Sequence, residues 1–375
     1  MIWVSVLPYT LVAIGAAALG AVVDYLRPME GRTSPKWHRI IAEVAFWVMV
    51  AGLVAFSGFR HDTGTDFPLY ETLLEQLDPT QAWWPQMVAS PQDPGFTLLS
   101  LICLSISSDV QLVMIVSAVL TVTPMCLALR YSSKTLWFSM LLYVLLAGYL
   151  FPMNLVRQGI AVALNFYAWR YLDSHRERFL LINAVASLFH LSALVAAALQ
   201  YVLRNIRPGR MFYTTVAVIA AAGIAILALP VDSLLAGNDS RYLEYLETAR
   251  KNALDIGVGT IATIVFRLGT LVYTGSARSN TGEHRRFQVF ATATLPFLCV
   301  GVFVSAVARM ELYFASALLI LLPRVAVSRQ PRMLHITGIV MAASVYFVAT
   351  LLSFYDLLPY QIWVPSPTDP WFAGW

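Results

Sequence analysis

Residues 109–130 read DVQLVMIVSAVLTVTPMCLALR, and this stretch decides the fold class. No residue between Asp109 and Arg130 carries a charge. An α-helix needs about 20 predominantly apolar residues to cross the hydrocarbon core of a bilayer. The stretch therefore has the length and composition of a transmembrane helix.

Similar apolar runs recur through the 375-residue chain, which is 58% hydrophobic and only 12% charged, with a mean hydropathy of +0.68. A soluble domain is about 25% charged, so a soluble enzyme, a secreted disulfide scaffold and a nucleic-acid-binding protein all fit poorly. We predict an all-α polytopic membrane protein of about 10–12 membrane segments, forming one integral membrane domain over 1–375. The runs are 3–23, 40–58, 94–108, 109–129, 135–151, 152–172, 179–203, 211–229, 258–274, 287–308, 312–327 and 333–354.

Most of the 25 Lys and Arg residues lie in short clusters between these runs. Cytoplasmic loops carry an excess of Lys and Arg, so the clusters predict the cytoplasmic side. The two longest remaining loops, 59–93 and 230–257, then lie outside, as do both termini, and the second loop contains a helical stretch, 240–253. The clusters are Arg27/Arg32/Lys36/Arg39, Arg130/Lys134, Arg170/Arg176/Arg178, Arg204/Arg207/Arg210, Arg278/Arg285/Arg286 and Arg324/Arg329/Arg332.

Two runs, 94–108 and 179–203, do not fit a simple count of spans. If both are broken or re-entrant, every basic cluster faces the cytoplasm and Arg157 faces outward. If both cross the membrane, the middle of the chain flips and Arg157 becomes cytoplasmic. We favour broken elements, because non-helical backbone is tolerated at membrane depth where it lines a cavity.

The first outer loop crowds ionisable and hydroxyl side chains directly after an apolar run, with Arg60, Asp62, Thr63, Asp66 and Tyr70 within eleven positions of one another. A guanidinium binds phosphate through two parallel hydrogen bonds, and a carboxylate accepts hydrogen bonds from sugar hydroxyls. The loop can therefore hold a polar or anionic ligand. The alternative is a solvated loop with an internal Arg–Asp pair.

Polar groups also occur at the edges or centres of later runs. Arg157 and Gln158 precede the apolar residues 160–172, where a helix N-terminus would help to bind phosphate; the alternative is an arginine that extends to the interface. His190 lies in the middle of 179–203, as a packing residue or as a functional group at a helix break. Arg309 and Glu311 are two residues apart and do not face each other on a helix, so each needs a partner elsewhere.

Arg267 lies inside the run 258–274, where burying a charge is costly, and the sequence identifies no partner for it. Cys103, Cys126 and Cys299 each lie in an apolar run, without metal-ligand or disulfide spacing. No nucleotide-binding or hydrolase motif is present. We therefore expect neither a metal nor a cofactor, and nucleotide-driven transport is disfavoured.

Short segments in a fixed order resemble the EpsG-type branch of the Wzy polysaccharide polymerases. They extend from the first outer loop toward the C-terminus, and the ordered set is more specific than any one of them. Asp93 stands where that family more often has Glu, and the tail 367–372 is not typical of it. The segments are 60–66 with Tyr70, 93–96 with Leu98 and Leu99, 156–161, 189–194, Arg241-Tyr242 with Tyr245, 309–311 with Tyr313 and Phe314, and 358–360.

The resemblance implies a GT-C-like glycosyltransferase of the bacterial inner membrane. Such an enzyme joins oligosaccharide repeat units carried on undecaprenyl pyrophosphate, on the periplasmic face, and releases undecaprenyl pyrophosphate. Its ligands are this lipid-linked oligosaccharide and membrane lipid, with no metal, cofactor or nucleic acid. A flippase and a chain-length regulator are candidate partners.

Roles within this scheme follow from charge. Preorganised cations stabilise a leaving pyrophosphate, and Arg157, Arg309 and Arg60 are the first candidates. A base must take the proton of the acceptor hydroxyl, and the sequence does not rank the candidates Asp62, Asp66, His190 and Glu311. The remaining substrate-binding candidates are Thr63, Tyr70, Gln158, Arg241, Tyr245 and Tyr313.

Two other functions remain open at this point. An O-antigen ligase-like transferase would move glycan from the same carrier to a different acceptor and give a single attachment instead of a ladder. A transporter or non-catalytic component of a polysaccharide secretion system would need ionisable groups along a path through the bilayer. The polar groups gather mainly on one side, which favours a transferase.

Overall fold

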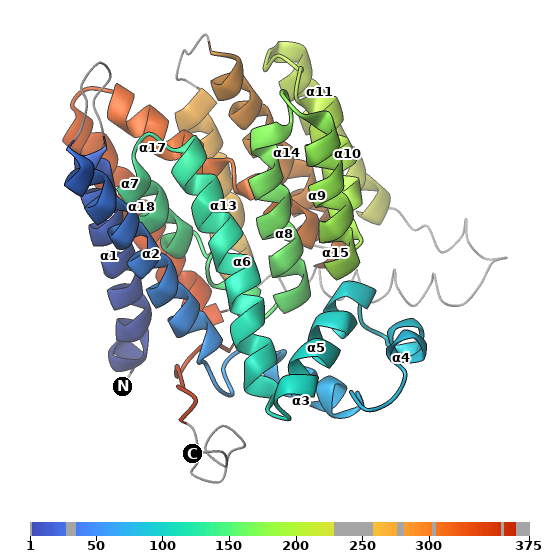
Figure 1. Ribbon diagram of the computed structural model, residues 1–375. Helices are drawn as coiled ribbons and strands as arrows, with labels where there is room; N and C mark the ends of the chain where they lie inside the picture. Colours follow the sequence, from blue (N-terminus) through green and yellow to red (C-terminus); the bar gives the residue numbers. More distant parts are fainter. Residues whose placement is uncertain are drawn as a thin grey trace, which may run out of the picture. The chain divides into compact units, whose positions relative to one another are not determined.

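The computed structural model describes residues 2–27, 35–228, 258–275, 281–301, 305–353 and 356–364. These residues are almost entirely helical (Figure 1), with one isolated β-bridge between Arg60 and Ile362. The prediction of an all-α polytopic membrane protein is therefore confirmed. The chain divides into two compact units: unit 1 comprises Met1–Ala197 and Ala343–Trp375, and unit 2 comprises Ala198–Ala342. The single-domain organisation stays a prediction.

Four helices in the described part of the chain are long and apolar enough to cross a membrane. They are α1 (Ile2–Leu26), α2 (Lys36–Gly58), α6 (Val110–Ser132) and α18 (Arg332–Ser353). A bent pair, Arg309–Ala315 with Leu318–Ser328, gives a fifth if its 41° break is counted within one span. Most of the other predicted membrane segments are short or interrupted helices.

Most of the shorter elements lie within the predicted apolar runs, whereas α3 and α4 are helices in the predicted outer loop 59–93. Proline occupies an early position in three of the shorter elements, where its missing N–H costs nothing: Pro68 in α3, Pro94 in α5 and Pro152 in η1. The elements are α3 (Phe67–Glu75), α4 (Trp83–Ala89), α5 (Pro94–Ile106), α7 (Leu136–Leu145), η1 (Phe151–Met153), α8 (Val156–Ala168), η2 (Trp169–Tyr171), α9 (Arg176–Phe189), α10 (Ser192–Leu203), α11 (Arg210–Ala228), α13 (Val258–Gly275), α14 (Gly282–Gly301), α15 (Ser305–Ala308), η4 (Arg309–Glu311), α16 (Leu312–Ala315) and α17 (Leu318–Ser328).

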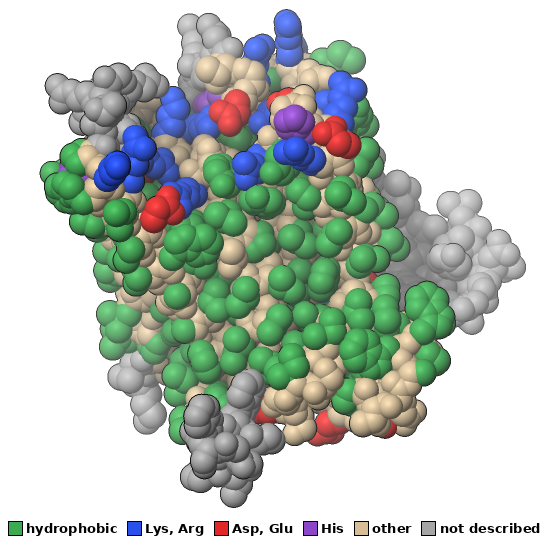
Figure 2. Space-filling view, viewed as in Figure 1, with side chains coloured by type: hydrophobic (Ala, Val, Ile, Leu, Met, Phe, Trp, Pro, Cys, Tyr) green, Lys and Arg blue, Asp and Glu red, His purple; other side chains and the backbone are tan. Residues whose placement is uncertain are grey.

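The long helices are apolar on both faces, as a membrane environment requires. In α2, Phe46 and Leu53 are buried, whereas Ile40 and Val44 are 62% and 57% exposed. Figure 2 shows hydrophobic side chains along the helices of one face, with Lys and Arg gathered at helix ends. The apolar surface that would be a liability in water here faces lipid.

Three of the predicted cytoplasmic clusters meet at one end of unit 1. Arg27 donates to the Arg130 carbonyl at 3.1 Å, and the Arg130 guanidinium pairs with Glu43. Arg170 lies over the Tyr131 ring, with its guanidinium carbon 3.9 Å from the centroid. We call this the basic end of unit 1.

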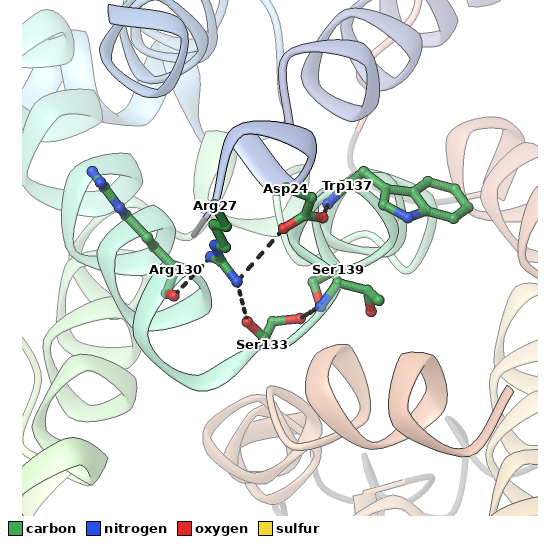
Figure 3. Close-up of polar contacts among 7 residues, drawn as sticks. Asp24, Arg27, Arg130, Ser133, Trp137 and Ser139 are labelled. Atoms are coloured by element: carbon green, nitrogen blue, oxygen red, sulfur yellow. Dashed lines mark hydrogen bonds and ion pairs between the residues drawn. The ribbon is translucent and has the colours of Figure 1, made fainter. Parts of the chain in front are cut away.

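Two charged side chains at the end of α1, Asp24 within the helix and Arg27 directly after it, cap two other helices at the basic end (Figure 3). Arg27 donates to the carbonyls of Arg130 and Ser133 at 3.1 and 2.9 Å, and these carbonyls close the last turn of α6. Asp24 accepts the Trp137 N–H of the first turn of α7 at 3.0 Å. These groups have no partner within their own helices, so α1 fixes the α6–α7 turn.

Helix α5 does not traverse unit 1. Its 13 residues span about 20 Å, well short of a bilayer core. Asp93, directly before it, contacts Arg157, and Gln111, shortly after it, donates to the Arg60 carbonyl at 3.3 Å. Both ends of α5 thus lie at the end of unit 1 opposite the basic end, which agrees with a re-entrant or interfacial 94–108.

The run 179–203 is also interrupted, as predicted. Helix α9 ends at Phe189, and His190 has extended backbone, with φ −163° and ψ 118°. Helix α10 begins at Ser192. The break leaves the His190 side chain at the end of unit 1 that carries Arg157.

Candidate active site

One carboxylate joins two helices at the end of unit 1 opposite the basic end. An Oδ2 of Asp93 lies 2.9 Å from the Arg157 guanidinium and 3.5 Å from Nδ1 of His190. The side chains of Asp93, Arg157 and His190 are 19%, 29% and 34% exposed, so a ligand can reach them. We call these three residues the site cluster.

Each member of the site cluster stands at a helix terminus. Asp93 is the residue before α5, Arg157 lies in the first turn of α8, and His190 follows α9. A glycine permits one of the close contacts involved. A Cβ added to Gly95 would lie 2.8 Å from both the Cβ and the carbonyl oxygen of Leu188, so only glycine lets the start of α5 approach the end of α9 this closely.

The start of α8 is packed equally tightly. A Cβ added to Gly159 would lie 2.6 Å from Cβ of Pro152. This contact seats the first turn of α8, which contains Arg157 and the buried Gln158, against the segment that precedes it. The N-terminus of a helix favours anions through its free N–H groups and its dipole.

Tyr70 of α3 adds a phenol beside Arg157. It is 4% exposed, and its ring centroid lies 5.6 Å from that of Phe96. Burial raises the pKa of the Tyr70 phenol above its usual value, and the charge and hydrogen bonding of Arg157 oppose part of that rise. The phenol is therefore neutral at physiological pH and able to donate a hydrogen bond.

Arg60, which the sequence predicts to contact substrate, has a buried side chain in the structure. It is 2% exposed and donates to the carbonyls of Ser57 and Met153 at 2.5 and 2.8 Å. No ion pair to it is found among the described residues. Burial lowers its pKa to about 10, so it stays charged at neutral pH. We therefore assign Arg60 a positioning role: it ties the end of α2 to the segment that leads into α8.

The rest of the first outer loop is held to the same segment. The Asp66 N–H donates to Oδ1 of Asn154 at 2.7 Å, and Gly64, with φ +103°, packs against that oxygen and the Met153 carbonyl. Thr63 is buried and donates to the His61 carbonyl. These contacts place Asp66 at the edge of the site.

Asp62, by contrast, is exposed on a left-handed turn with φ 42°. Within the described part of the chain, no contact is found between Asp62 and the site cluster.

The segment 356–364 covers the first outer loop. The His61 N–H donates to the Gln361 carbonyl at 3.0 Å, and the Trp363 N–H donates to the Phe59 carbonyl at 2.7 Å. Tyr360 stacks on Phe56 with centroids 4.2 Å apart and donates its hydroxyl to the Phe56 carbonyl at 2.8 Å. The Leu-Pro-Tyr motif of 358–360 is thus structural, holding the loop that supports the site.

Three candidate residues in the described part of unit 2 are Arg309, Glu311 and Tyr313. Glu311 is 4% exposed and forms a buried ion pair with Arg267, with Nε and Oε1 2.6 Å apart. This supplies the partner for Arg267 that the sequence did not identify. Arg309 is exposed, and Tyr313 is fully buried. The candidates Arg241 and Tyr245 lie outside the described residues, as does the predicted helical stretch 240–253.

Two residues of the site were not among the sequence candidates. Asp93 was considered through the family resemblance, as a base with a shorter reach than the more common Glu, and was left out of the candidates, whereas Asn154 was not given a role. The signal for Asp93 was present in the sequence, because an acidic residue before Pro-Gly marks a helix start. Asn154 carried no such signal, since its role depends on a contact with a loop 88 positions away.

The arrangement combines a cation at a helix N-terminus with a histidine oriented by a carboxylate. The first can stabilise an anionic leaving group, and the second can accept a proton. No group of three or more His, Cys, Asp or Glu side chains suited to a metal occurs in the described part of the chain.

Comparison with models of protein families gives a match over most of the chain. The model of the EpsG family matches residues 43–362, which is most of the chain and includes all of the site cluster. No curated protein and no solved structure matches the chain significantly.

Proposed function

This chain belongs to the EpsG family, and from that membership together with the site cluster we propose that it is a membrane glycosyltransferase that polymerises lipid-linked oligosaccharide units. Family membership supports a polymerase-type role in polysaccharide biosynthesis in general. The donor in our proposal is the growing glycan on undecaprenyl pyrophosphate, and the acceptor is the next lipid-linked repeat unit. The observation that carries the proposal is the contact of Asp93 with both Arg157 and His190.

Arg157 and the N-terminus of α8 bind the pyrophosphate of the donor in this proposal. Negative charge grows on the pyrophosphate as the bond from the anomeric carbon to its oxygen breaks. A guanidinium and helix N–H groups already in place stabilise that charge without reorganising. The neutral Tyr70 phenol beside Arg157 supplies a further donor.

His190 is our choice among the candidate bases. Asp93 faces its Nδ1 at 3.5 Å, which leaves Nε2 as the proton acceptor, as in other carboxylate-oriented histidines. The acceptor oxygen bonds to the anomeric carbon and gives its proton to Nε2, while the pyrophosphate leaves with the electron pair of the broken bond. Glu311 is less suited, because its carboxylate is held by Arg267 inside unit 2.

In our proposal, the reaction takes place on the outer, periplasmic side of the inner membrane. The support is the separation, within unit 1, of the site cluster from the basic end. Lys and Arg clusters mark the cytoplasmic side of membrane proteins. The site cluster then opens on the opposite side.

Reconstitution with the substrate tests the proposal. Purified protein is incubated with a synthetic undecaprenyl-pyrophosphate-linked repeat unit of the native glycan, and the products are resolved by gel and mass spectrometry. We expect a ladder spaced by one repeat. A single addition to another acceptor would indicate a ligase, and intact substrate with folded protein would contradict a transferase.

Variants of the site cluster connect the activity to the geometry. Arg157→Ala and His190→Gln are each expected to lower the rate at least about a hundredfold, the scale of removing a charge-stabilising donor or a base. Arg130→Ala is the matched control, because it also breaks an arginine–carboxylate pair in unit 1 but at the basic end. Equal losses in Arg130→Ala and Arg157→Ala would remove Arg157 from the chemistry.

A further inference from the structure

In unit 2, the guanidinium groups of two arginines lie close to one aromatic ring. The guanidinium carbons of Arg286 and Arg324 lie 5.5 and 5.1 Å from the centroid of the Phe287 ring. Arg324 also pairs with Glu283 at 2.9 Å and interacts electrostatically with His284. We call His284, Arg286, Phe287 and Arg324 the unit 2 basic cluster.

His284 is buried with an unsatisfied nitrogen. The residue is 5% exposed, and its Nε2 has no hydrogen-bond partner among the described residues. Its backbone N–H, by contrast, donates to the Thr281 hydroxyl at 3.3 Å. Buried polar atoms of native proteins are nearly always paired, and leaving one unpaired costs stability. A ligand that accepts a hydrogen bond would satisfy Nε2 in its N–H form.

The positive charge near Nε2 of His284 favours an anionic ligand. Two guanidinium groups lie at the Phe287 ring, one of them paired with the Glu283 carboxylate, and Arg285 and Arg329 add positive charge close by in the chain. Arg329 is fixed there by donation to the Tyr273 carbonyl at 2.9 Å. Arginine forks match phosphate oxygens in pairs, so phosphate fits better than a smaller anion.

The Glu283 carboxylate pairs with Arg324, at the place where a phosphate group would bind. The Glu283 side chain is 47% exposed, and an exposed ion pair contributes little to stability. A phosphate can therefore displace this carboxylate at small cost, which opens the unit 2 basic cluster to a ligand.

We propose that the unit 2 basic cluster binds a phosphate group, presented by the headgroup of an anionic phospholipid or by a soluble phosphate ester. Positive clusters of this kind are predicted to face the cytoplasm, where anionic lipids attract basic residues. The inference does not depend on the proposed polymerase activity, and its test does not use it.

Lipid binding by purified protein in neutral detergent provides the first arm. Native mass spectrometry is used to titrate phosphatidylglycerol against phosphatidylcholine. We expect tighter binding of phosphatidylglycerol and about a tenfold loss of that binding in Arg324→Ala, the effect of one charge-assisted hydrogen bond. Glu283→Gln is expected to act oppositely and strengthen binding, because it removes the competing carboxylate. This gain cannot arise from misfolding.

Arg332→Ala is the matched control, because Arg332 is an exposed arginine close by in the chain. Inorganic phosphate provides the second arm, measured as thermal stabilisation against sodium chloride of equal ionic strength. If only inorganic phosphate has an effect, the ligand of the unit 2 basic cluster is a soluble phosphate ester. If only phosphatidylglycerol binds, the ligand is a lipid headgroup. If both have an effect, the cluster recognises the phosphate group itself. Equal binding of the two lipids with no effect of phosphate beyond chloride overturns the proposal, as does an equal loss in Arg332→Ala.

Discussion

At the scale of single residues, the carboxylate of Asp93 holds the candidate site of unit 1 together. Asp93 stands before α5 and contacts one residue from α8 and another that follows α9. Three helix termini are thereby joined by one carboxylate. An amide in its place keeps the shape but loses the charge that attracts Arg157 and orients His190.

Gly64 gives a residue-scale prediction about the loop beside the site. Its φ of +103° suits glycine alone, and an added Cβ would lie 3.2 Å from Oδ1 of Asn154. Gly64→Ala is expected to destabilise the protein by about 1–3 kcal/mol and to displace the Asp66–Asn154 hydrogen bond. Thermal unfolding in detergent measures the first effect.

Gly52 in α2 supplies the control for this substitution. Nothing lies within 4 Å of a Cβ added there, and alanine is the better helix former. Gly52→Ala is therefore expected to leave the unfolding temperature unchanged or raise it slightly. A similar drop in both variants would show that the conformation of Gly64 is not the cause.

At the scale of elements, the contacts of α1 with α6 and α7 are testable (Figure 3). Arg27→Ala removes two hydrogen bonds to the terminal carbonyls of α6, and hydrogen bonds from charged groups contribute about 1.5–3 kcal/mol each when well formed. Because Arg27 is 32% exposed, we expect a loss near the lower figure, measured by thermal unfolding. Arg39→Ala, an exposed arginine at the same end, should have little effect, and an equal loss there would contradict the capping role.

The pair of Arg267 and Glu311 connects α13 to the η4 turn in unit 2. Removing one partner leaves a buried charge uncompensated, so Arg267→Met and Glu311→Leu are each expected to cost about 3–5 kcal/mol. The double variant Arg267→Met/Glu311→Leu replaces both charges by apolar groups and should be more stable than either single variant. Unfolding temperatures of the four proteins form a double-mutant cycle; additive losses would show that the pair contributes no coupling.

At the scale of the molecule, the prediction concerns sidedness. Thr65 and Ser174 are exposed, Thr65 beside the site and Ser174 next to the basic cluster after α8. In a background without Cys103, Cys126 and Cys299, a membrane-impermeant maleimide should label Thr65→Cys in spheroplasts and Ser174→Cys only after permeabilisation. The reverse pattern would invert unit 1 in the membrane, and labelling of both would contradict their placement at opposite ends.

Much of this architecture follows from the sequence. Runs of about 20 uncharged, apolar residues predicted the long helices, since an α-helix pairs all of its backbone polar groups within one segment and can therefore cross lipid. The pattern of basic clusters predicted that Arg157 and Arg170 would lie at opposite ends of one helix. The interruption of 179–203 was also expected, because a broken run leaves every basic cluster on the cytoplasmic side.

The site was only partly predictable. Arg157 and His190 were candidates because polar groups in apolar runs are costly, but periodicity could not reveal that Asp93 lies between them. Arg60 was expected to contact substrate, but it is buried and donates to the Met153 carbonyl, 93 positions away in the sequence. The pairing of Arg267 with Glu311 is similarly long-range. Such contacts depend on how helices pack, which local sequence patterns do not specify.

The sharing of Asp93 between Arg157 and His190 has a kinetic consequence for the proposed reaction. A pyrophosphate that takes over Arg157 frees the carboxylate to face the imidazole alone, so the base becomes fully oriented only after the donor has arrived. Catalysis would then proceed by ordered addition, with the donor first and the acceptor second. Such a sequence keeps the base idle in the unoccupied enzyme, so proton transfer from an acceptor hydroxyl begins only when a donor is in place.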